Sequence, residues 1–145
     1  MGEKRKKILA VIIVILTLGF SYAHGQTIRE MEQIFQKAID LDELQPFYHE
    51  KEIKARIPLI IINDSKIPND LKLMKFGEPV KIISKSVAFQ LGFNLDDIME
   101  LVSFEYGDDM AQIELNYRPE GIRVKVYLKK SRNDWRVKRS NIIEY

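Results

Sequence analysis

Residues 122–130 read IRVKVYLKK, and this stretch decides the fold of the chain. From residue 122 to residue 128 every second position is isoleucine, valine or leucine, with arginine, lysine or tyrosine between them. Successive side chains of a strand point to opposite faces of a sheet, so this period of two predicts a strand with one buried face. Residues 111–117 repeat the pattern. The Pro119 and Gly121 between the two stretches are typical of a hairpin turn.

Two further strands are predicted on either side of this pair. Residues 99–106 are rich in aromatic, β-branched and long apolar side chains, and Gly107-Asp108-Asp109 follows them as a turn. Downstream, Ser131 to Asp134 lead into Trp135-Arg136-Val137 and a final run that ends at Tyr145. Because short turns between consecutive strands imply antiparallel neighbours, residues 98–145 predict a four-stranded meander.

The charges of the meander are segregated along the chain. Residues 91–117 contain seven acidic residues and no lysine or arginine, whereas residues 118–139 contain nine basic residues and two acidic ones. Alone, the second stretch resembles a nucleic-acid patch. Beside acidic strands it favours cross-strand pairing on a solvated face, where each pair contributes about 0.2–1 kcal/mol.

The first 25 residues have the three parts of a secretory signal peptide. A basic start is followed by a short apolar run from Ile8 to Phe20 and by small residues at Ala23 and Gly25. The run is shorter than the roughly 20 residues that a membrane span needs. We expect cleavage after Gly25, with an uncleaved anchor as the alternative, and a periplasmic or secreted location. This leader carries four of the 23 basic and one of the 21 acidic residues, so residues 26–145 have 19 and 20, a net charge of −1. That balance argues against a nucleic-acid partner.

Residues 26–145 have the length of a single domain with one core. Apolar residues recur every three or four positions from Ile28 to Leu41, which predicts an amphipathic helix, ended before Pro46 at the latest. Residues 57–62 and 80–84 are apolar enough for strands, and residues 87–91 fit a strand or a helix. We therefore expect an α+β domain in which an N-terminal amphipathic helix packs on a curved antiparallel sheet.

The sequence names no catalytic residue, metal ligand or cofactor. It contains no cysteine, and His49 is the only histidine after the leader, so the usual zinc ligand sets and the Ser-His-Asp or Cys-His arrangements have no support. An enzyme is not favoured. The candidates for lining a ligand pocket are Phe104, Tyr117 and Trp135, although aromatic residues on the apolar face of a sheet are more often core.

The order of elements resembles the nuclear-transport-factor-2-like, or ketosteroid-isomerase-like, superfamily. The resemblance rests on the 111–117 strand, the Glu120-Gly121 turn, the 124–130 strand and Trp135-Arg136-Val137, about the last 35 residues. It implies a cone-shaped fold with a pocket. Members that catalyse use a pocket carboxylate and an aromatic hydroxyl, and no numbered position here matches either. A cystatin-like arrangement and a plain α+β sandwich remain open because residues 57–84 are rich in strands and turns.

Three functions from different classes follow. The first is a non-catalytic exported binding or structural module of the bacterial cell envelope with an unknown partner. Its binding surface would be the outward sheet face that carries Glu114, Asn116, Arg123, Lys125 and Tyr127. The second is a pocket protein for a small apolar ligand, with or without enzyme activity. The third is an inhibitor of a secreted protein that uses its hairpin tips. The partner and the oligomeric state stay open.

Overall fold

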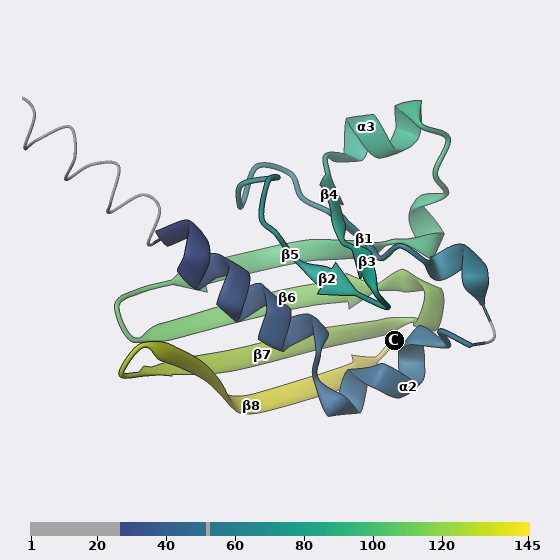
Figure 1. Ribbon diagram of the computed structural model, residues 1–145. Coiled ribbons are helices and arrows are strands. Elements are labelled where there is room, and N and C mark those ends of the chain that lie inside the picture. Colours follow the sequence, from purple (N-terminus) through teal and green to yellow (C-terminus); the bar gives the residue numbers. More distant parts are fainter. Residues whose placement is uncertain (1–26, 52) are drawn as a thin grey trace, which may run out of the picture.

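The computed structural model describes residues 27–145 apart from residue 52 (Figure 1). The predicted signal peptide, residues 1–25, lies outside the described residues, so its cleavage and the resulting location stay predictions. The α+β class is confirmed, because helices and a mostly antiparallel sheet occur together in the described part of the chain. No helix there is long and apolar enough to cross a membrane.

The described strands form one six-stranded sheet in the order β4-β1-β5-β6-β7-β8. Its members are β1 (Ile60–Ile62), β4 (Lys81–Ile83), β5 (Met99–Tyr106), β6 (Met110–Tyr117), β7 (Ile122–Ser131) and β8 (Asp134–Glu144). A separate hairpin contains β2 (Met74–Lys75) and β3 (Glu78–Pro79). The short helices are η1 (Asp42–Leu44), α2 (Gln45–Tyr48), η2 (Lys54–Arg56), α3 (Lys85–Gln90), η3 (Leu95–Asp97) and η4 (Arg118–Glu120).

Strands β5 to β8 lie where the alternating sequence predicts them, and each pairs antiparallel with the next. The apolar set of β7 is completely buried, as are its partners on β6 at positions 111, 113, 115 and 117. The β6–β7 turn is a single turn of 3-10 helix that ends at Gly121, whose φ of +61° favours glycine. A Cβ at this position would lie 3.3 Å from the carbonyl oxygen of Tyr145, a tight contact that adds to the preference for glycine.

A helix over residues 27–39 crosses the apolar face of the meander (Figure 1). Its buried residues Ile34, Phe35, Ala38 and Ile39 belong to the same core as the inward side chains of β5 to β8. The helix reaches the boundary of the described residues, so its beginning stays a prediction. Its other end is at residue 39, before Pro46 as expected, and Pro46 itself lies in the first turn of the separate helix α2. Proline suits the first turn of a helix, where its missing N–H has no partner to lose.

The other half of the sheet corrects the expectation of a purely antiparallel arrangement. Strand β1 pairs parallel with both β4 and β5. Parallel neighbours need crossover connections, and the chain provides one through the β2–β3 hairpin and one through α3. Residues 87–91, which fit a strand or a helix by pattern, lie in α3 and its end, and Ser84 caps this helix by accepting a hydrogen bond from Val87 N at 3.2 Å.

Helix α3 divides the outward side of the sheet, the side opposite the helix over residues 27–39, into a covered and an uncovered part. A second, smaller core contains Ile62, Ala88 and Ile98, with Ile60 and Ile83 packed against it. Ile61 and Ile82 point the other way into the main core. Both faces of β1 are therefore covered, which explains its continuous run of isoleucine. The outward side chains of β7 and β8 have no comparable cover and are mostly exposed or half-buried.

Candidate functional site

The uncovered part of the sheet is the surface most available to a partner, and we call it the outward face of the meander. The strand register places together the side chains whose neighbours point into the core. They are Glu100, Ser103 and Glu105 on β5; Met110, Gln112, Glu114 and Asn116 on β6; Arg123, Lys125, Tyr127 and Lys129 on β7; and Arg136, Arg139, Asn141 and Ile143 on β8. The five residues predicted for this face are all among them.

Charge changes sign across this face. Glu114 lies 3.4 Å from Arg123 Nε and 3.3 Å from Lys125 Nζ, and its side chain is only 12% exposed because the two cations cover it. Nearer the β6–β7 turn, Arg118 donates to Glu100 at 2.8 Å. The cross-strand pairing predicted from the segregated charges is therefore present between β5–β6 and β7.

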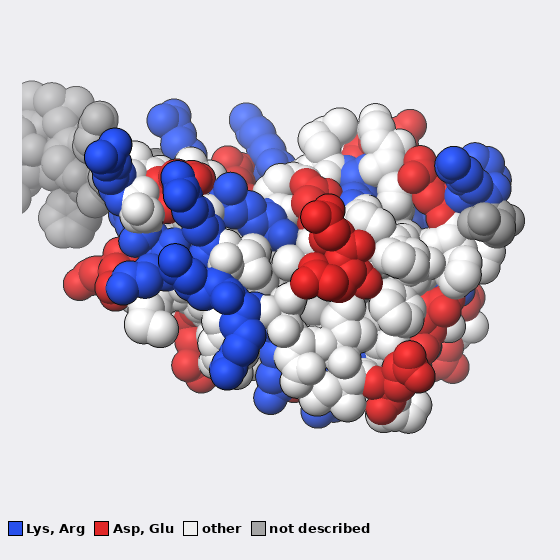
Figure 2. All heavy atoms as spheres, turned by 90° about the horizontal axis from the view of Figure 1, so that it is seen from below, with Lys and Arg blue, Asp and Glu red and all other residues white. Residues whose placement is uncertain are grey.

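The basic residues of β8 continue past this pairing. Among the described residues, no carboxylate lies within salt-bridge distance of Lys129, Lys138 or Arg139, and Arg136 has only the exposed Asp134 at 3.5 Å. The Arg139 guanidinium instead lies over the Tyr127 ring, 4.3 Å from its centroid. Figure 2, which looks at the β8 side, shows lysine and arginine gathered in a band at the β7–β8 hairpin end, next to a group of acidic side chains. This end of the face therefore has a surplus of positive charge.

A shallow hollow of about 370 Å³ opens beside Tyr127. The residues lining it are Glu105, Tyr106, Gly107, Met110, Ala111, Gln112 and Tyr127. Glu105, Gln112 and Tyr127 stand opposite one another on three consecutive strands, so the hollow lies across the outward face at the β5–β6 hairpin. None of the three residues predicted to line a pocket takes part in it.

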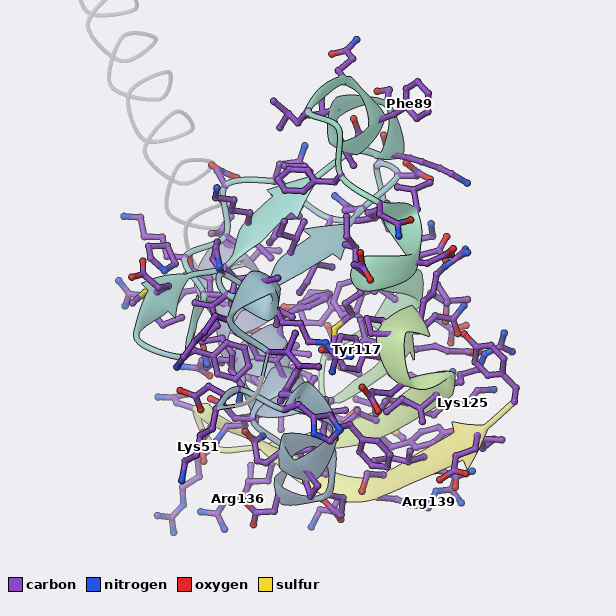
Figure 3. All side chains as sticks on the ribbon, turned by 90° about the vertical axis from the view of Figure 1, so that its right-hand side faces the viewer. Lys51, Phe89, Tyr117, Lys125, Arg136 and Arg139 are labelled. Carbon is purple, nitrogen blue, oxygen red and sulfur yellow. The ribbon has the colours of Figure 1, made fainter. Side chains whose placement is uncertain are left out.

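The predicted lining residues are instead placed in or next to the main core. Trp135 is completely buried, Tyr117 is 2% exposed, and Phe104 is half-buried against the core. Phe104 packs on Phe35 with ring centroids 5.0 Å apart, and Tyr117 lies in the interior at the centre of Figure 3. Tyr117 lies at one end of the sheet, next to the β6–β7 turn, whereas Phe104 and Trp135 lie farther toward the other end. Ligand binding by these three residues stays a prediction.

A polar cluster under the helix ties it to the hairpin end of the sheet. The Tyr106 hydroxyl donates to Glu30 Oε2 at 2.5 Å, and Lys130 Nζ donates to Glu30 Oε1 at 2.6 Å. Burial, and then the hydrogen bond to the Glu30 carboxylate, raise the pKa of Tyr106 from 10.0 to about 12. Trp135 packs beside this cluster, and its buried indole Nε1 has no hydrogen-bond partner among residues 27–51 and 53–145. The carboxylate is engaged by both donors, which suits a structural tie.

A second polar cluster surrounds His49 at the opposite end of the sheet. His49 ends α2 in a left-handed conformation with φ of 49°, and its Nε2 lies 3.4 Å from Glu120 Oε2. Arg56 holds the same carboxylate at 2.6 Å and also donates to the Phe47 carbonyl oxygen at 3.2 Å. Burial raises the pKa of Tyr117, which lies under the Arg56 guanidinium. His49 therefore serves as a capping residue. The described residues contain no group of three or more potential metal ligands.

The fold and these surfaces define an α+β domain whose described residues leave one sheet face open. No protein-family model, no curated protein and no solved structure matches the chain. The resemblance to the nuclear-transport-factor-2-like superfamily therefore stays a prediction.

Sequence patterns did not identify Lys129, Arg136 and Arg139 as residues of the binding face, and they did not predict the hollow. Simple alternation does not place both Arg136 and Arg139 on the outward face. The inward side chains of β8 have odd residue numbers up to Val137 and even residue numbers from Ser140 onward. The register with β7 shifts at this point, which leaves Lys138 as the extra residue of a β-bulge. The change from Val137 to Ser140 and Ile142 as inward positions follows only from the pairing with β7.

Proposed function

We propose that this chain is a non-catalytic exported binding module of the bacterial cell envelope, and that the outward face of the meander is its binding surface. The leader pattern of residues 1–25 supports export. The helix over residues 27–39 covers the other face of the sheet, and the described residues leave this one free. The observation that carries the proposal is a sheet face that the described residues leave uncovered, together with cations at its β8 side that have no carboxylate partner among those residues.

The chemistry of this face favours an acidic partner. Lys125 and Arg139 project on the same side of the molecule in Figure 3, and Tyr127 lies between them in the strand register. A tyrosine ring with flanking cations can contact apolar groups and carboxylates together, and complementary charge mainly raises the association rate and the specificity. Binding should therefore weaken as salt is added.

The proposal is tested by the double variant Lys125→Glu/Arg139→Glu of the full chain, incubated with the cell-envelope fraction. We expect retention on the envelope, measured by co-sedimentation at low and high salt, to fall by about tenfold or more because attraction becomes repulsion. The matched control is Lys66→Glu/Lys72→Glu, two exposed lysines in the loop between β1 and β2 with the same charge change. Equal retention of both variants and the unaltered chain would refute the proposed surface.

The hollow beside Tyr127 supports a second candidate, the binding of a small ligand. Its volume of about 370 Å³ lies within the usual range for ligand pockets, although most of its wall is open. Met110 is the lining residue that exposes a large apolar side chain, 60% of it. A ligand that binds there should lose affinity in Met110→Glu and keep it in Phe89→Glu, an exposed apolar site elsewhere. Equal affinities would place the ligand outside the hollow.

A further inference from the structure

Strand β8, on the basic side of the molecule, is a long strand at the edge of the sheet. It covers eleven residues, and within the described part of the chain β7 is its only neighbour in the sheet. The opposite edge strand, β4, has three residues. A free edge presents backbone N–H and C=O groups to another strand, and native proteins usually shorten or obstruct such edges.

The backbone groups at the free edge can be assigned from the ladder. Tyr145 N donates to the carbonyl oxygen of Gly121 at 2.9 Å, which continues the antiparallel register that pairs Ile122 with Glu144. Hydrogen-bonded and non-hydrogen-bonded pairs alternate along such a ladder. Arg139, Asn141 and Ile143 therefore bond to β7. The intervening residues Ser140, Ile142 and Glu144 turn their N–H and C=O groups toward the open edge.

The side chains along this edge differ on its two sides. On the outward side stand Arg136 and Arg139, and Lys138 projects at the bulge between them; all three are exposed. On the inward side Val137 and Ile142 are half-buried at the rim of the main core. Side chains of a strand alternate between faces, so a strand added here would place every second side chain beside the arginines and the others beside apolar rim residues.

We propose that β8 binds an extended peptide segment in which acidic and apolar residues alternate, and that the segment adds a seventh strand to the sheet. Main-chain hydrogen bonds supply the affinity in this mode of recognition, and the alternating side chains supply the specificity. The inference rests on the proposed binding role and names the chemistry of the partner.

Charge argues against a second copy of the chain as the occupant. In an antiparallel pairing of two β8 strands about a two-fold axis near Lys138, the cations of one copy would stand opposite those of the other. Like charges placed directly opposite one another destabilise a sheet. An acidic segment meets the same residues with opposite charge.

The first test uses a blocked seven-residue peptide with alternating glutamate and valine, titrated into the full chain and followed by backbone amide NMR. We expect saturable binding, with the largest shifts and slowed amide exchange at Ser140, Ile142 and Glu144. The same peptide with N-methyl groups on alternate amides keeps its charge and loses strand pairing, so it should bind at least about tenfold more weakly. Equal binding of both peptides would overturn strand addition and leave a charge contact alone.

The second test alters the protein. Arg136→Glu/Arg139→Glu should weaken the glutamate–valine peptide by about tenfold and favour a lysine–valine peptide, whereas Lys66→Glu/Lys72→Glu should do neither. Ser140→Pro removes an amide donor from the free edge and also the hydrogen bond from Ser140 Oγ to Glu43 Oε1 at 3.1 Å, whereas Ser140→Ala removes the side-chain bond alone. Ser140→Pro should therefore weaken the peptide while Ser140→Ala binds normally. If Ser140→Pro does not fold, the N-methylated peptide still decides.

Three results would overturn the proposal: no binding of the glutamate–valine peptide at millimolar concentration, shifts confined to other strands, or a dimer that forms through β8 in the free protein. Any of these can occur while Lys125→Glu/Arg139→Glu still abolishes envelope retention. In that case the outward face stands and only the edge fails. If the glutamate–valine peptide does not bind and Lys125→Glu/Arg139→Glu also keeps full envelope retention, the proposed function itself is refuted.

Discussion

The two halves of the sheet are built by different rules. In the β5–β8 half, consecutive strands of eight to eleven residues pair with one another across short turns. In the β1–β4 half, strands of three residues pair in parallel with partners that lie about twenty to forty residues away in the chain. The first half is stabilised by alternating apolar side chains over one large core. The second depends on a small second core and on individual polar side chains that hold its loops.

The largest expected effect is in the meander half. Trp135→Ala removes a completely buried ring and should lower the free energy of unfolding by about 3–5 kcal/mol, measured by urea denaturation. Tyr127→Ala is the control, because this ring lies half-buried on the outward face, and it should cost about 1 kcal/mol. A loss below about 1 kcal/mol for Trp135→Ala would contradict the core position of this residue.

The next effect belongs to the β1–β4 half and tests its dependence on polar groups. The buried Asn63 amide donates to the Ile67 carbonyl oxygen at 2.6 Å and accepts from Lys66 N at 2.9 Å. Asn63→Ala leaves these groups unpaired and should cost about 2 kcal/mol in the same denaturation measurement. Asn69→Ala removes one partner of Asn63, at 2.7 Å, and should cost less. If both variants are as stable as the unaltered chain, the loop is held by other contacts.

The burial of Asn63 also makes it a poor glycosylation acceptor, although Asn63-Asp64-Ser65 fits the sequence pattern for N-glycosylation.

A smaller effect concerns the tie between the helix and the hairpin end. The folded protein holds the Tyr106 proton more tightly than an unfolded chain, with a pKa of about 12 against 10.0. The neutral hydroxyl therefore stabilises the fold below pH 10, and this contribution is lost as the pH rises through about 12. In Glu30→Gln the pKa of Tyr106 should fall toward 10, measured by NMR titration of labelled tyrosine rings. An unchanged pKa would mean that burial alone sets it.

The smallest effect is expected on the outward face itself. Glu114→Gln removes the negative charge between Arg123 and Lys125, and a cross-strand pair of opposite charge contributes about 0.2–1 kcal/mol. We expect a loss of stability at the lower end of that range, which shrinks further in high salt. The same variant should strengthen binding of an acidic partner because the two cations are released. A loss of several kcal/mol would show that Glu114 has a structural role that its position on the outward face does not suggest.

Prediction from sequence followed the same division between the halves. Strands β6 and β7 could be located because each carries its own alternation, and β5 and β8 because apolar, aromatic and β-branched residues follow or precede turns marked by glycine, asparagine or aspartate. The parallel pairing of β1 could not be predicted. Its three isoleucines indicate that both faces of the strand are buried, but they do not indicate which strands lie beside it. The first helix does end before Pro46, as predicted, but the place of Pro46 in α2 could not be predicted, since proline ends one helix or begins another according to where the following chain packs.

The binding surface was partly predictable. Glu114, Asn116, Arg123, Lys125 and Tyr127 follow from the alternation of β6 and β7 alone. Arg136 and Arg139 required knowledge of the bulge at Lys138, and the hollow beside Tyr127 required three strands in register. Phe104, Tyr117 and Trp135 were recognisable as inward residues. Their division between the two ends of the core depended on the packing of the helix and of α2.

The sequence by itself determined the α+β class, the four strands of the meander and the polar character of its outward face, because these depend on periods of two and on turns within a few residues. The tertiary structure decided the parallel strands, the cover that α3 gives to one part of the outward side, and the free edge of β8. Each of these depends on contacts between segments far apart in the chain, and their free energy is a sum over partners that no local pattern contains.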